Sequence, residues 1–372
     1  MRRILPAPPA YKGGSTLVTE KNVYGGGITP SCPVPLTEYP HVLLAHGGGG
    51  TMSRMLIENI FVPAFGNDSP AALHDGAVLD LENNNIALTT DSFVVRPIFF
   101  PGGDIGTLAV NGTVNDLAMC GARPRFLSAG FVLEEGLLME SLWRVALSMG
   151  AAADAAGVRI ITGDTKVVER GKGDQIYINT AGVGVIECAQ SITPSRIRPG
   201  DVVIINGDIG RHGMAVLAKR EGLHFESAIT SDCAPLGDVV LDMVHAGIDI
   251  HCLRDLTRGG LAAAANEIAA AAGAHIILDE RSIPVSNPVR AACEMLGLDP
   301  LHVANEGRFI AFIPKKDSDR VLEILHAHPV GINAAVMGTV TDNQGGLVTL
   351  RTLVGTQVIL ETQSGEQLPR IC

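Results

Sequence analysis

The sequence predicts two α+β domains in succession. Its 372 residues are enough for two domains of ordinary size, and 46% hydrophobic residues can fill a core in each. Strand-like runs alternate with helix-like segments on both sides of a break at residues 191–201. Because 43 glycines and much alanine accompany only 4% aromatic residues, we expect tight turns and helices packed closely on sheets.

The first part of the chain is predicted to be an extension followed by a domain. Residues 1–40 are rich in proline and glycine and show no sustained periodicity, so we expect them to be disordered or loosely attached. Residues 41–190 should form the N-terminal domain. One helix is expected to begin at Met52, and another to run from Asp104, a potential N-cap, to Ala118. A third should run from Leu142 towards Ala156. The expected strands are 78–81, 86–90, 126–133, 158–162 and 176–185.

The break SITPSRIRPGD (191–201) is the predicted domain boundary, because two prolines and a glycine separate a finished strand from a new one. Residues 191–345 should form a second α+β domain, and residues 346–372 a mobile tail, since the periodicity weakens there into short strand-like pieces. The expected strands are 202–206, 250–253, 276–278, 309–313 and 336–340, and the expected helices 212–221, 235–246, 260–272, 288–296 and 317–327.

Charge and cysteine content narrow the function. A net charge of −11 without a Lys/Arg cluster disfavours nucleic acid and anionic membrane as partners. No stretch approaches the roughly 20 apolar residues of a membrane span, and no apolar segment follows the first arginines as in a signal peptide. The seven cysteines form no C-x-x-C pair, and their odd number favours a reduced, cytoplasmic protein.

The sequence ends in Cys372. A thiol on a mobile tail can collect a group elsewhere and carry it into a pocket. Taken alone, an accidental terminal cysteine is the simpler explanation. The carboxylates and glycines of the preceding chain, which suit an ATP-dependent enzyme, favour the carrier interpretation.

Glycines and carboxylates of the N-terminal domain predict a nucleotide site. The glycine run at 47–50 precedes a helix, where backbone N–H groups can approach phosphate, although a plain linker is an equal alternative. Aspartates at strand ends point into the crevice where ligands collect, and several together suit Mg²⁺ bridging phosphates. Each aspartate alone is more often a turn former or a cap. The residues concerned are Gly47, Gly48, Gly49, Gly50, Asp75, Asp91, Asn115, Asp116, Asp164 and Thr165.

A second anion site is expected in the C-terminal domain, where RDLTRGG (254–260) leads into an alanine-rich helix. Arg258 and Gly259 would contribute bidentate contacts and the positive end of the helix dipole. Further along this helix, Glu267 lies among alanines. Such a carboxylate pairs with a cation, is solvated on an outer face, or has a raised pKa suited to proton transfer.

Five segments carry a close family resemblance: 89–137, ITGDTKVVERG (161–171), RDLTRGG (254–260), ANEG (304–307) and the final PRIC. Together they resemble the HypE family of carbamoyl dehydratases in [NiFe]-hydrogenase maturation. The resemblance covers roughly residues 41–372 and places the chain in the aminoimidazole ribonucleotide synthetase-like superfamily. It implies a homodimer whose N-terminal domains build a central β-barrel, with MgATP in a cleft beside the C-terminal domain.

The resemblance also implies roles for single residues. Asp75, Asp91, Asp116 and Asp164 would hold Mg²⁺ and, with Asn115, the nucleotide, while Cys372 would accept the carbamoyl group. Lys166 and Glu267 match polar positions near the reacting group, and either is a candidate to move the proton. The implied partners are the carbamoyl transferase HypF and the HypC–HypD complex that holds the iron and cyanide.

The chemistry implied is dehydration of a thiocarbamate on Cys372 to a thiocyanate, the source of the cyanide ligands. Because oxide is a poor leaving group, ATP would first phosphorylate the thiocarbamate oxygen. Two alternatives remain. One is a relative that acts on a free small molecule, such as selenophosphate synthetase, whose reactive Cys or selenocysteine lies in a glycine-rich loop where residues 46–51 of this chain have none. The other is a non-catalytic carrier.

Overall fold

The structure, a computed structural model, describes residues 51, 54–55, 77–81, 84–223, 227–362, 368 and 370–372. The expected extension at 1–40 and most of the helix expected from Met52 lie outside these residues. Two large sheets and a small two-stranded sheet make up the β-structure of the described chain, which passes from one large sheet to the other between Ile186 and Asp201. The prolines and glycine of the expected linker occupy this passage.

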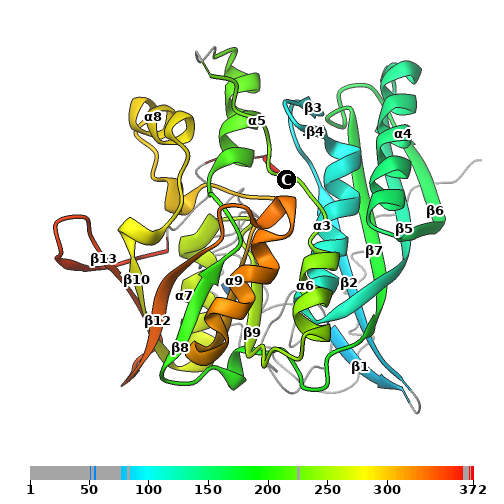
Figure 1. Ribbon diagram of the computed structural model, residues 1–372. Helices are drawn as coiled ribbons and strands as arrows, with labels where there is room; N and C mark the ends of the chain where they lie inside the picture. The colour runs from blue at the N-terminus through cyan, green and yellow to red at the C-terminus, as the bar shows by residue number, and fades with distance from the viewer. Residues whose placement is uncertain are drawn as a thin grey trace, which may run out of the picture.

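The N-terminal domain is built on a five-stranded sheet in the order β1-β2-β7-β5-β6. Neighbouring strands are antiparallel except β5 and β6, which are parallel. Helices α3 and α4 pack against each other beside this sheet (Figure 1). The elements are β1 (Ala77–Leu81), β2 (Asn84–Phe93), β3 (Phe99–Phe100), β4 (Gly103–Asp104), α3 (Ile105–Met119), β5 (Ala122–Glu134), α4 (Met139–Ala155), β6 (Arg159–Val168) and β7 (Ile176–Ile186).

Helix α3 is the buried centre of the molecule. Asp104 caps it as expected, since its Oδ1 accepts from the backbone N–H of Gly106 at 2.7 Å and Thr107 at 3.0 Å. A Cβ at Gly106 would lie 2.5 Å from the carbonyl oxygen of Val145, so α3 and α4 approach more closely than a larger residue would allow. Because α3 also contacts α6 and β9, it joins the two domains.

The C-terminal domain is built on a seven-stranded sheet in the order β14-β13-β10-β12-β8-β11-β9. Neighbouring strands are antiparallel except β10 and β13. The elements are β8 (Asp201–Ile205), α5 (Arg211–Glu221), α6 (Gly237–His245), β9 (Cys252–Asp255), α7 (Gly260–Ala272), β10 (Ala274–Asp279), α8 (Asn287–Leu296), β11 (Phe309–Pro314), α9 (Ser318–His326), β12 (Ala335–Gln344), β13 (Leu347–Arg351) and β14 (Gln357–Ile359).

Alternation along the central strands puts a helical layer on each face of this sheet. In β8, Val203 and Ile205 pack in one hydrophobic cluster with α7. Val202 and Ile204 point the other way, into a cluster with α6 and α9. Both sets are buried, which explains why β8 reads as a continuous apolar run rather than an alternating one.

The region expected to be a tail from residue 346 begins differently. Strand β13 pairs with β10, and β14 pairs with β13, so the second domain extends to Ile359, beyond the boundary expected at 345. These strands are only five and three residues long, too short to show a clear periodicity. No helix in the described part of the chain is both long and apolar enough to cross a bilayer.

Candidate active site

Asn115 on α3 bridges the two domains. Its Nδ2 donates to the carbonyl oxygens of Ala234 at 3.1 Å and Glu306 at 3.2 Å, and its Oδ1 accepts from the N–H of Leu236 at 2.8 Å. The side chain is 2% exposed. Asn115, expected to bind the nucleotide, therefore has its amide engaged by backbone groups of the C-terminal domain.

Asp91 and Asp116 come together with Arg258 and Cys372 at the seam between the domains. Desolvation of the Arg258 guanidinium lowers its pKa, but the negative charges of Cys372, Asp91 and Asp116 outweigh this and raise the pKa. Burial raises the pKa of Asp91, and the charge of Arg258 offsets only part of that rise. Thr89 on β2 donates its hydroxyl to Asp116 Oδ2 at 2.8 Å and so fixes that carboxylate against the sheet.

The end of the chain is docked in this seam, and Figure 1 marks it beside α5. We call residues 370–372 the terminal segment. The N–H of Val94 donates to the Cys372 oxygen at 3.2 Å, and the N–H of Arg96 donates to the Arg370 carbonyl at 3.0 Å. Ile371 is 3% exposed and packs in the N-terminal core with Phe93. The terminal segment is thus held by backbone pairing and by one anchored side chain.

Glu306 is the functional candidate that the sequence analysis missed. It is 2% exposed, and its Oε1 has no hydrogen-bond partner. Burial raises the pKa of Glu306 well above the usual value, and the nearby charges of Asp255, Asp232 and Asp91 raise it further. The ANEG segment (304–307) had marked this position, but nothing in the sequence shows that the side chain turns inward.

Two further buried atoms beside Glu306 lack partners, Asp232 Oδ1 and Asn111 Oδ1. Asn111 Nδ2 donates to the Cys233 sulfur at 3.5 Å. Burial, followed by the charge of Glu306, raises the pKa of the Cys233 thiol, so this second cysteine stays protonated and unreactive. Unpartnered polar atoms at this depth are typical of a site that awaits a polar ligand.

Asp164, Thr165 and Lys166 are not brought to Asp91. They lie on β6, the edge strand, and β7 and β5 separate β6 from β2. At about 4.8 Å per strand the separation is roughly 14 Å along the sheet, so one ion cannot bind directly to both Asp91 and Asp164 of this chain. Lys166 Nζ pairs with Asp164 Oδ2 at 2.8 Å, and both side chains are about 70% exposed.

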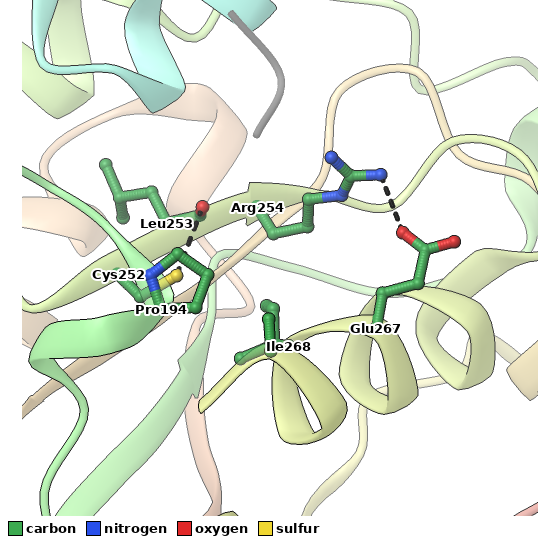
Figure 2. A pocket seen from close by; sticks show the side chains of 7 residues that line it. Pro194, Cys252, Leu253, Arg254, Glu267 and Ile268 are labelled. Carbon is green, nitrogen blue, oxygen red and sulfur yellow. Dashed lines mark hydrogen bonds and ion pairs between the residues drawn. The ribbon is translucent and has the colours of Figure 1, made fainter. Parts of the chain in front are cut away.

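Glu267 is ion-paired. Its Oε2 lies 2.9 Å from Arg254 Nη2. Figure 2 shows this ion pair, whose two side chains line a small pocket with Cys252 and Ile268. Cys252 and Ile268 belong to the core of the C-terminal domain, whereas Cys372 packs against the core of the N-terminal domain. Glu267 also lies about 10 Å along α7 from Gly260. Of the three states expected for this carboxylate, pairing is the one found.

Helix α7 begins at the expected anion site. Gly259 is its N-cap, with a φ of 74°, and Gly260 has a φ of 60°. A Cβ at Gly260 would lie 2.6 Å from the Val303 carbonyl oxygen, so the helix start is pressed against the loop that leads to Glu306. Arg258 precedes these glycines and reaches the Asp91 cluster. The N-terminus of α7 therefore faces the seam.

The residues present fit Mg²⁺ only with help from phosphate. No three His, Cys, Asp or Glu side chains converge as a metal site anywhere in the described ranges. Mg²⁺ in nucleotide sites is usually bound by one or two carboxylates together with phosphate oxygens and water. Asp91 and Asp116 meet that need. Asp75 and Gly47, Gly48, Gly49 and Gly50 lie outside the described residues, so their predicted roles stay predictions.

Two family models cover the chain. The AIR synthase related protein N-terminal domain matches residues 73–186, and the corresponding C-terminal domain matches residues 198–351. Fold and seam thus define a two-domain α+β enzyme of the aminoimidazole ribonucleotide synthetase class.

Individual relatives show which family within this class the chain resembles. Carbamoyl dehydratase HypE of Azotobacter vinelandii is 50% identical over 331 residues, which is 89% of this chain and 97% of that protein. A solved HypE in complex with ATP is 48% identical with a TM-score of 0.76, covering 89% of this chain and all of that one. HypE in a solved HypE–HypF complex is 46% identical with a TM-score of 0.78, covering 83% and 99%. The chain belongs to the HypE family of carbamoyl dehydratases.

Proposed function

We propose that this enzyme uses ATP to dehydrate a carbamoyl group carried on Cys372 to a thiocyanate, which supplies the cyanide ligands of the [NiFe]-hydrogenase iron. The observation that carries the proposal is the docked terminal segment. Its last residue lies where its charge acts on Arg258, together with the charges of Asp91 and Asp116. A solved relative in complex with ATP supports ATP as the nucleotide that is used.

The atoms of the reaction balance in two stages. The thiocarbamate oxygen attacks the γ-phosphorus of ATP, ADP leaves, and the nitrogen gives up one proton, which yields an S-bound phosphoryl imidate. The C–O bond then breaks, phosphate leaves with both electrons, and the nitrogen gives up its second proton to form the C≡N triple bond. Mg²⁺ held at Asp91 and Asp116 would offset phosphate charge, and Arg258 would do the same from the start of α7.

Glu306 is the residue we propose as proton acceptor. A general base works best when its pKa lies near the working pH, and burial raises the pKa of Glu306 in that direction. Its unpartnered Oε1 is available to a nitrogen-bound proton. Glu267, the residue expected from the sequence, is engaged with Arg254 instead. Lys166 remains a predicted contributor, on the exposed strand β6.

We also propose a homodimer joined through the N-terminal domains. Strand β6 is an edge of the sheet and is exposed along almost its whole length. Its apolar residues Ile161 and Val167 are 55% and 67% exposed. A long apolar edge strand left uncovered invites pairing with another chain. Pairing of two such sheets would close the central barrel expected for the superfamily.

HypF, which the solved complex shows bound to a relative, is the partner we propose for carbamoylation, and the HypC–HypD complex is the proposed recipient of cyanide. None of the six described cysteines forms a disulfide, in keeping with the reducing cytoplasm that we propose as the location.

The mass of the intact protein tests the proposal. After incubation with carbamoyl phosphate, ATP and the transferase, we expect the protein first to gain a carbamoyl group and then, as it turns over ATP, to lose one water. A free-substrate enzyme would instead keep its ATPase turnover in a Cys372→Ala variant, and a non-catalytic carrier would hold the carbamoyl group without losing water.

A further inference from the structure

His212, the second residue of α5, lies fully buried where three segments meet. Its Nδ1 is 2.8 Å from the Ser231 hydroxyl, and its Nε2 is 2.9 Å from the carbonyl oxygen of Ile371. Phe100 of β3 packs edge-to-face on the His212 ring, with the ring centroids 5.3 Å apart. One imidazole therefore touches the C-terminal domain, the β3–β4 hairpin and the terminal segment.

Chemistry fixes the direction of each hydrogen bond. A carbonyl oxygen can only accept, so Nε2 of His212 carries the hydrogen that is donated to Ile371. Burial lowers the pKa of His212, with partial compensation from Asp232, so the ring is neutral and Nδ1 accepts from the Ser231 hydroxyl. The Ser231 oxygen in turn accepts from the N–H of Cys233 at 3.0 Å. Only one tautomer satisfies all three bonds.

We call the hydrogen-bonded series Cys233–Ser231–His212–Ile371 the relay. Its Ser231 end is fixed to the β3–β4 hairpin. The N–H of Ser231 donates to the Pro101 carbonyl at 2.8 Å. A Cβ at Gly102 would lie 2.7 Å from the Ser231 nitrogen, so the Ser231 loop lies directly on the hairpin. Neither Ser231 nor His212 can turn away without losing these contacts. The relay thus offers a fixed donor to a carbonyl that belongs to the terminal segment.

We propose that His212 is a positioning residue that holds the terminal segment in its docked state, so that the Cys372 thiol is presented to the cluster of Asp91, Asp116 and Arg258. This inference rests on the proposed function, in which Cys372 carries the group that reacts. When the segment leaves, the Nε2–H of His212 loses its buried acceptor, which favours the docked state. Because His212 contacts a backbone carbonyl, it holds a free and a carbamoylated Cys372 alike.

Two variants at the same position separate hydrogen bonding from packing. His212→Leu keeps an apolar group of similar size beside Phe100 but has no donor, whereas His212→Gln keeps an N–H that can reach Ile371. His326→Leu is the matched control, since His326 also lies near a backbone carbonyl, that of Ala334 at 3.1 Å, in a different part of the molecule.

Hydrogen–deuterium exchange reports docking without any catalysis, because Val94 and Arg96 donate their N–H groups to the terminal segment. We expect His212→Leu to exchange about tenfold faster than wild type across residues 93–97, the effect of one lost buried hydrogen bond. His212→Gln should stay within about threefold of wild type, and His326→Leu should match wild type.

Single-turnover kinetics supply the second measurement. Starting from fully carbamoylated protein, His212→Leu should lose water about tenfold more slowly, while its carbamoylation by the transferase is not slowed. Wild-type exchange and wild-type dehydration in His212→Leu would overturn the proposal. So would equal defects in the Leu and Gln variants, because that result assigns the effect to packing.

If His212→Leu does not fold, Ser231→Ala takes its place. It removes the hydroxyl that fixes the tautomer, and we expect faster exchange at 93–97 in a folded protein; unchanged exchange would overturn the proposal. Failure of wild-type carbamoylated protein to lose water with ATP refutes the proposed function instead, and the exchange comparison still decides whether His212 holds the segment.

Discussion

Asp91 and Asp164 have the same local structure and opposite electrostatics. In both, Oδ1 accepts from the N–H of the next residue at 2.8 Å, and both lie on ten-residue strands. Burial raises the pKa of Asp91 on β2, whereas the hydrogen bond from Lys166 lowers the pKa of Asp164 on β6. The difference arises from strand order, because β2 lies under α3 and β6 is an edge. Both aspartates lie within their strands rather than at the strand ends that the sequence suggests, and a carboxylate on a strand becomes a site only where the rest of the fold covers it.

The largest effect is expected from loss of the Cys372 thiol, which lies in the seam with Asp91. Cys372→Ala should abolish both carbamoylation and thiocyanate formation, since no other group can hold the carbamoyl. ATP binding and thermal stability should stay near wild type, because the terminal segment is held by backbone hydrogen bonds and by Ile371, which the substitution leaves in place. Mass spectrometry of the terminal peptide and calorimetric titration with ATP measure the two properties. Hydrogenase maturation by the variant would refute the carrier role.

A comparison of two glutamates is expected to give the next largest effect. Glu306→Gln should slow dehydration by about 10²-fold or more, because the amide cannot accept the nitrogen proton. Glu267→Gln should retain most of the rate, since its carboxylate serves the ion pair with Arg254. Single-turnover loss of water from carbamoylated Cys372 measures both. The reverse order of defects would return the proton transfer to Glu267.

The two aspartates themselves should differ in nucleotide binding. We expect Asp91→Asn to weaken Mg²⁺-dependent ATP binding about tenfold, the loss of one charged ligand, and Asp164→Asn to weaken it less. Titration with ATP at fixed Mg²⁺ gives both dissociation constants. Equal losses of ATP affinity in the two variants would show that Asp164 contributes to nucleotide binding without sharing one Mg²⁺ ion with Asp91 of the same chain.

Stability should depend on pH with opposite signs at the two kinds of carboxylate. The folded pKa of Glu306 is raised, so its folded form binds the proton more tightly and its contribution is lost as pH rises above the unfolded value, about 4.3. Glu306→Gln should therefore flatten the fall of Tm between pH 4 and 7. Asp164, whose pKa is lowered, contributes stability that is lost as pH falls through its folded pKa. Thermal melts of Glu306→Gln from pH 4 to 7 and of Asp164→Asn below pH 4 measure the two slopes, and a wild-type slope in either variant would contradict the assignment for that carboxylate.

The smallest effect is expected at Lys166. Its ion pair with Asp164 is exposed, and such pairs contribute little to stability. Lys166→Met should leave the free energy of unfolding of the single chain unchanged in urea titration at low protein concentration. A clear loss that appears only at concentrations where the proposed dimer forms would show that pairing across β6 covers the ion pair.

The sequence predicts where helices and strands lie along the chain better than it predicts which of them lie side by side in the fold. The apolar periods locate strands such as β8 and β11 and helices such as α3, and the Asp104 cap is confirmed. The same reasoning cannot supply strand order, so it groups Asp164 with Asp91. Nor can it show which way Glu267 and Glu306 point. Glu267 pairs with Arg254, thirteen residues earlier in the chain, and Glu306 lies near Asp232 of a distant loop and Asp255 at the end of β9.

Asn115 has a mechanical consequence. Its one side chain ties α3 to the Ala234–Leu236 loop and to Glu306, so the domains cannot part without breaking three buried hydrogen bonds together. Release of residues 370–372 breaks a different set of bonds, those with Val94, Arg96 and His212, and leaves the three bonds of Asn115 intact. On the proposed function, the carbamoyl group would therefore be exchanged by movement of the terminal segment alone, while the two domains keep their contact.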